Sequence, residues 1–116
     1  MSNQINTDDA AKARNTAMVA LALLRRTIQA AAPGLKALPH VHGLLAGLDA
    51  DLGRADDVLT AGGGVDLLDR VGLLLQAADD GEIQPGGGLS GDAVGSLVLA
   101  AREASVRLGV FLALAR

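Results

Sequence analysis

Regular spacing of apolar residues near the C-terminus is the feature that most constrains the fold. Between Leu89 and Arg116 they recur in alternating steps of three and four, which keeps one side of an α-helix apolar. The members of this seam are Val94, Leu97, Ala101, Ala104, Leu108, Phe111 and Ala115. Ser90 is a suitable N-cap, and Leu89 and Val94 occupy the positions of a hydrophobic staple. We therefore predict a long helix whose apolar side the rest of the chain covers.

Three further helices are predicted from the same periodicity and from the residues that end them. They cover residues 8–32 before Pro33-Gly34, residues 39–61 before a run of three glycines, and residues 66–80 before Gly81. The second has the most regular seam, formed by Val41, Leu45, Leu48, Leu52, Ala55 and Leu59. No segment alternates apolar and polar residues over a useful length, so no strand is predicted. Residues 1–7 are polar, and we expect a flexible N-terminus ahead of a single domain over residues 8–116.

Short connectors between these helices favour antiparallel neighbours, and hence an all-α, up-down four-helix bundle. The third helix is too short to cover its neighbours fully. The centre of the first helix is apolar almost all round, which is typical of a helix that is buried on several sides or that contacts another subunit. We therefore expect a homo-oligomer, with an interface formed by Leu21, Leu24, Leu108, Phe111 and Leu112.

Composition argues against several classes of protein. The chain of 116 residues has no cysteine, which removes disulfides, thiolate metal sites and cysteine nucleophiles and fits a cytoplasmic location. The polar N-terminal segment lacks the apolar core of a secretory signal. The longest apolar runs, residues 17–24 and 110–115, are far shorter than the ~20 residues of a membrane span. The Ala-, Gly-, Leu- and Arg-rich, lysine-poor usage is typical of GC-rich bacterial genes.

Charge is unevenly distributed, because ten of the thirteen acidic residues lie between positions 37 and 92 while both ends are basic. The acids Asp79, Asp80 and Glu82 stand at a predicted helix C-terminus, where the helix dipole disfavours negative charge. This cost would be offset by a basic partner or a weakly held cation. Together with Arg25 and Arg26 of the first helix, these acids are our candidate site for a charged partner.

Other chemistry has little support in the sequence. His40 and His42 are two residues apart at a helix start, so they point in different directions, and a metal site would need ligands from another helix or another chain. The glycine runs resemble phosphate loops, but Asp66 and Asp92 in the following helices would repel an anion. No serine has a nearby base. We therefore predict no catalytic residue, no metal and no cofactor.

The expected function is that of a non-enzymatic helical module for protein–protein interaction or scaffolding, acting as a homo-oligomer. One alternative is a carrier that holds an apolar small molecule between its helices. Another is a small regulator that contacts nucleic acid through the basic residues of the first helix. Nucleic acid is the less favoured partner, because the chain has no Tyr or Trp for stacking and a pI of about 5.1.

Overall fold

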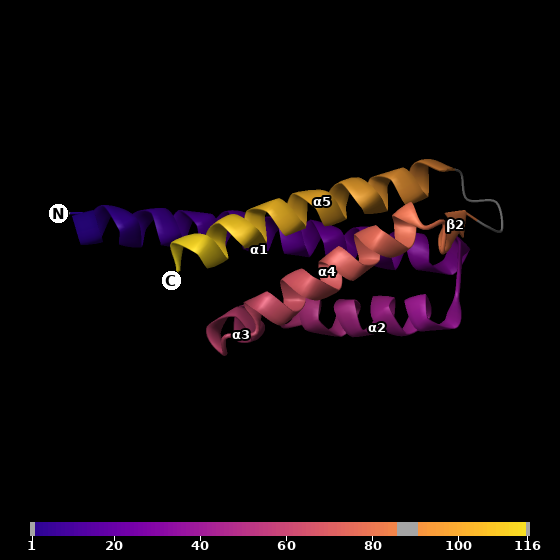
Figure 1. The fold of residues 1–116 in the computed structure, drawn as a ribbon, viewed down its shortest axis with the longest axis horizontal. Coiled ribbons are helices and arrows are strands. Elements are labelled where there is room, and N and C mark those ends of the chain that lie inside the picture. The colour runs from indigo at the N-terminus through magenta and orange to yellow at the C-terminus, as the bar shows by residue number, and fades with distance from the viewer. Residues whose placement is uncertain (1, 86–90, 116) are drawn as a thin grey trace.

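The computed structural model describes residues 2–85 and 91–115, and these residues are predominantly helical, as predicted (Figure 1). The elements, in order, are α1 (Ser2–Ala31), a 3₁₀-helix η1 (Ala32–Gly34), β1 (Leu35–Ala37), α2 (Pro39–Gly53), α3 (Ala55–Thr60), α4 (Gly64–Asp79), β2 (Ile83–Pro85) and α5 (Gly91–Leu114). The prediction of an all-α chain is therefore confirmed, apart from the two short strands.

Four of the helices surround a single apolar core. The most extensive contact joins α1 to α5, which run antiparallel; α4 packs on α5, and α2 packs on both α1 and α4 (Figure 1). The largest fully buried side chains come from all four of these helices, and they are Leu21, Leu24, Leu48, Leu67, Leu74, Leu97, Leu108, Val41 and Val71. Every residue of the seam predicted for residues 39–61 is buried, which confirms that seam.

The helix predicted over residues 39–61 is divided in two at Arg54, so its prediction as one element is wrong. Arg54 leaves the helical region, with φ −127° and ψ 35°, and α3 begins at the next residue. The break lies beside Asp51, an acidic residue that is only 8% exposed. Asp51 forms ion pairs with Arg54, at 3.2 Å, and with Arg70 of α4. Because the pair with Arg70 is tertiary, the helical periodicity carried no sign of it.

Two strands of three residues each pair into an antiparallel ribbon, which corrects the prediction of no strand. Leu35 lies opposite Pro85, Lys36 opposite Gln84, and Ala37 opposite Ile83. Leu35 and Ile83 are buried and belong to the main core. Strands this short cannot display an alternating pattern over a useful length, so tertiary pairing decides their conformation.

Several helix ends lie where the sequence predicts them, and others lie at different residues. Pro39 opens α2 at one of its first positions, and Gly62 and Gly81 adopt φ of +85° and +76° after α3 and α4, as expected for glycines that end helices. Helix α1 begins at Ser2, before the predicted start, and α4 begins at Gly64. The predicted cap at Ser90 and the glycines 86–88 lie outside the described residues.

The molecule is elongated, with extents of 55 × 23 × 22 Å, and the first turns of α1 extend beyond the other elements (Figure 1).

Candidate functional site

Three of the five residues predicted for a subunit interface lie inside the chain's own core. Leu21, Leu24 and Leu108 are each 0% exposed. In this fold a second copy of the chain has no access to them. Phe111 and Leu112 are partly buried and pack against the same core, so a part of each side chain remains accessible. The periodicity correctly indicated burial, but it could not distinguish burial within one chain from burial between two.

Most of the exposed large aliphatic side chains are instead on the outer sides of α1 and α5. Two aliphatic side chains of α1 and four of α5 are 43–71% exposed, and we call this set the α1/α5 apolar face: Val19, Leu23, Leu99, Val106, Val110 and Leu114. On each helix the members follow one another in steps of four or seven, so they share one stripe. Exposed single aliphatic residues are ordinary, but two such stripes on helices that pack against each other are a candidate interaction surface.

The partners of the two helices explain why these stripes face solvent. On α1, Arg14 and Arg25 point to α3 and α2, where they pair with Asp56 and Asp49. Helical spacing places Val19 and Leu23 on the side of the helix away from these arginines. On α5, Val98 lines a hollow between α5 and α4. The exposed stripe of α5 lies farther around the helix axis from α4 than Val98 does. The α1/α5 apolar face is therefore the side of this helix pair that α2 and α4 leave uncovered.

One ion pair interrupts the apolar face. Glu103 and Arg107 are four residues apart on α5, and the Arg107 Nε donates to Glu103 Oε1 at 2.7 Å. Both side chains are about half exposed, so the pair contributes roughly 0.3–0.5 kcal/mol to helix stability. A surface of aliphatic stripes with a few exposed charges resembles the mixed character of interfaces between proteins that also exist apart.

The structure does not assemble the predicted site for a charged partner. Arg25 Nε donates to Asp49 Oδ1 at 3.3 Å, Asp80 accepts from Gln76 at 3.1 Å, and Glu82 pairs with His40 at 3.2 Å. Arg26 is exposed, and Asp79 lines the hollow between α4 and α5. Within residues 2–85 and 91–115, no hydrogen bond or ion pair joins the two arginines to the three acids.

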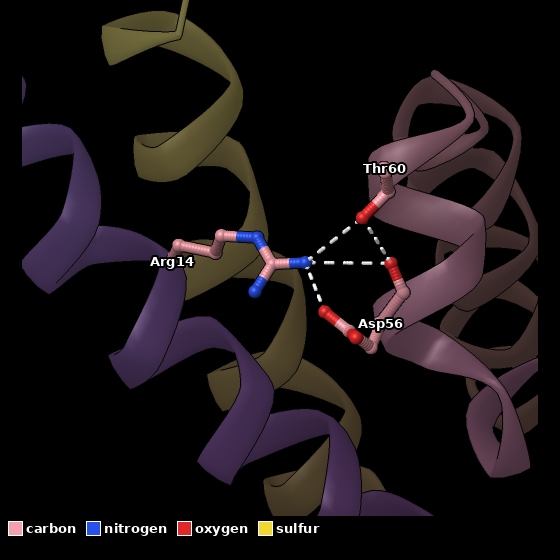
Figure 2. Close-up of polar contacts among 3 residues, drawn as sticks. All are labelled: Arg14, Asp56 and Thr60. Carbon is pink, nitrogen blue, oxygen red and sulfur yellow. Dashed lines mark hydrogen bonds and ion pairs between the residues drawn. The ribbon is translucent and has the colours of Figure 1, made fainter.

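A polar clamp fixes the first half of α1 to α3 (Figure 2). The Arg14 guanidinium donates to the Asp56 carboxylate, to the Asp56 backbone oxygen at 3.3 Å and to the Thr60 hydroxyl at 3.3 Å. The Thr60 hydroxyl in turn donates to the Asp56 backbone oxygen at 2.8 Å. These residues are 42 and 46 positions apart from Arg14, so helical spacing alone could not have revealed the clamp.

A hollow of about 390 Å³ lies between the last turns of α1, the strand β1 and the first part of α2. Its floor is formed by buried apolar side chains of Ile28, Leu35 and Leu45. Gln29, Ala32, His42, Ala46 and Asp49 complete the lining. The sequence indicated that His42 and Asp49 share one side of their helix, but it gave no sign that α1 and β1 close an apolar pocket beside them.

The described parts of the chain contain neither a candidate metal cluster nor a candidate membrane span. No group of three or more His, Asp or Glu side chains is placed to hold a metal ion within residues 2–85 and 91–115. Over the same residues, none of the helices combines the length and the apolar character that crossing a bilayer requires. Among the described residues, the carboxylate that pairs with a histidine is that of Glu82, whose Oε2 lies 3.2 Å from His40 Nε2.

Comparisons of the chain with protein-family models, with curated proteins and with solved structures find no match.

Proposed function

We propose that this protein is a non-enzymatic helical module that acts by self-association through the α1/α5 apolar face. In this proposal the chain is an antiparallel up-down four-helix bundle, in which α2 and α3 together count as one bent helix. The observation that supports the proposal best is the presence of six large aliphatic side chains, 43–71% exposed, on two neighbouring helices. A second copy related by a two-fold axis would cover this face with the same face, as in most homodimers.

The size of the face sets the expected strength of the contact. Fully burying an aliphatic side chain contributes about 1.5–3 kcal/mol, so covering a side chain that is already half buried contributes about 1 kcal/mol. Six such side chains from each protomer would give about 12 kcal/mol before the cost of association, which is about 4–15 kcal/mol. We therefore expect a weak dimer whose population depends on protein concentration.

Sedimentation equilibrium over a range of concentrations tests this proposal. The wild-type mass should rise from 11.7 kDa toward twice that value as the concentration increases. Val106→Asp should keep the protein monomeric, because two copies of a carboxylate would be placed in the contact. Val65→Asp is the matched control, because Val65 is 60% exposed against 58% for Val106 but lies on α4, outside the face.

Two outcomes would contradict the proposal. A wild-type mass that stays at 11.7 kDa up to millimolar concentration would show that the face does not mediate self-association. Equal loss of association in Val65→Asp and Val106→Asp would show that the contact is not formed by the α1/α5 apolar face. Helical circular dichroism of each variant should match the wild type, because both positions are exposed to solvent.

A further inference from the structure

We propose that the hollow between α1 and α2 binds a small aliphatic amine, with its alkyl chain on the apolar floor and its ammonium group on Asp49. The hollow is lined from α1 by Ile28 and Gln29, from η1 by Ala32, and from α2 by residues that include Leu45 and Asp49. These residues do not belong to the α1/α5 apolar face. The inference is therefore independent of self-association and holds for a monomer as well as for a dimer.

The floor of the hollow provides the apolar part of the site. Ile28, Leu35 and Leu45 are 3–8% exposed, and their remaining surface lines a hollow of about 390 Å³. Pockets that bind small molecules have volumes of about 300–1,000 Å³ and mainly apolar linings with a few polar groups. A volume near the lower end of that range suits one short alkyl chain rather than a lipid.

Asp49 provides the polar part of the site. Its side chain is 34% exposed, and its Oδ1 accepts a hydrogen bond from Arg25 Nε at 3.3 Å. Its second oxygen, Oδ2, has no hydrogen-bond partner within residues 2–85 and 91–115. An ionised carboxylate oxygen can only accept hydrogen bonds, so the group that satisfies it must be a donor.

The position of Arg25 leaves the hollow side of Asp49 open. A Cβ atom placed on Gly53 would lie 2.9 Å from Arg25 Cζ, so the guanidinium rests against Gly53. Gly53 follows Asp49 by four residues on α2, whereas Ala46 and His42, which line the hollow, precede Asp49 by three and seven. Arg25 therefore approaches Asp49 from the C-terminal side of α2, and the hollow lies on its N-terminal side.

Charge favours an ammonium group over other donors. A hydrogen bond from a charged donor to a carboxylate is roughly twice as strong as a bond between neutral groups. The chain has a net charge of −3, and ten of its thirteen acids lie between positions 37 and 92, the segment that includes α2. Over the whole chain this negative balance favours a cation over an alkyl carboxylate of the same length, although Arg25 beside Asp49 opposes a second cation at short range.

Titration of the 15N-labelled full chain with n-octylammonium, followed by NMR, tests the site. We expect saturable shifts at the amides of the residues that line the hollow, with smaller effects elsewhere. Octan-1-ol should bind about five- to tenfold more weakly, because its donor is neutral, and octanoate should not bind measurably. Absence of saturable binding, or equal binding of octanoate, would overturn the inference.

Matched variants separate the contribution of the Asp49 carboxylate to binding from general effects of charge. Asp49→Asn should weaken n-octylammonium binding about five- to tenfold, whereas Asp56→Asn removes the same charge and an arginine pair outside the hollow and should leave binding unchanged. Ala46→Leu should block the hollow, whereas Ala50→Leu on the same helix lies outside its lining and should not. Equal effects within either pair would contradict the assignment.

Discussion

Leu108 provides the sharpest test of whether the C-terminal seam holds one chain together or joins two. Its side chain is 0% exposed and belongs to the core cluster that α5 shares with α1, α2 and α4. Replacing a fully buried leucine with alanine removes its apolar contacts and leaves a cavity, which costs about 2–5 kcal/mol. We expect Leu108→Ala to lower the free energy of unfolding by about 3 kcal/mol.

The expected loss is a large fraction of the total stability. A domain of this length is stable by roughly 5–15 kcal/mol, and a change of 1 kcal/mol shifts its melting temperature by about 4 °C. A loss of about 3 kcal/mol therefore corresponds to a melting temperature about 12 °C lower. Urea unfolding, followed by far-ultraviolet circular dichroism at a concentration where the protein is monomeric, measures the difference directly.

Leu73→Ala is the matched control for this experiment. Leu73 lies on α4 and is 58% exposed, so its truncation should change the free energy of unfolding by no more than about 0.5 kcal/mol. If Leu108→Ala instead kept wild-type stability in the dilute monomer and lost only its association, Leu108 would be part of a subunit contact. That result would refute the assignment of this seam to the core.

Two further predictions concern the ends and the bend of helices, and both are measured by urea unfolding. Gly81→Ala should be destabilising by about 1 kcal/mol, because Gly81 has φ +76°, whereas Gly72→Ala inside α4 should be stabilising by up to about 1 kcal/mol. Loss of stability in Gly72→Ala would contradict this reasoning. Asp51→Asn should be destabilising by about 1–3 kcal/mol, because it leaves Arg54 and Arg70 without their buried acid. Asp56→Asn, in an exposed pair, should cost less than about 1 kcal/mol, and an equal loss in both variants would show that the burial of Asp51 is unimportant.

Local patterns predicted the parts of the fold that depend on neighbouring residues. The seam from Val41 to Leu59 is buried throughout, and Pro39, Gly62 and Gly81 stand at helix boundaries as expected. Each of these features follows from helical periodicity or from the conformational limits of a single residue. They can therefore be predicted from one sequence without any knowledge of the tertiary structure.

Features that depend on distant residues were missed. The break at Arg54 lies beside the ion pair between Asp51 and Arg70, and the strands exist because residues 35–37 meet residues 83–85. The sequence also assigned Leu108 to an interface, because periodicity shows that a side chain is buried but not what buries it. The residues of the α1/α5 apolar face stand in the sequence as apolar residues outside the seams. The burial pattern of the folded chain is what distinguishes them from residues of the core.

The length of the molecule changes how it moves through water. A particle of 55 × 23 × 22 Å experiences more friction than a sphere of equal mass. A single chain should consequently elute from a sizing column earlier than a spherical protein of 11.7 kDa. Early elution of the monomer would therefore resemble the elution of a dimer. Rotational diffusion of the monomer should also differ between rotation about the long axis and rotation about the two short axes.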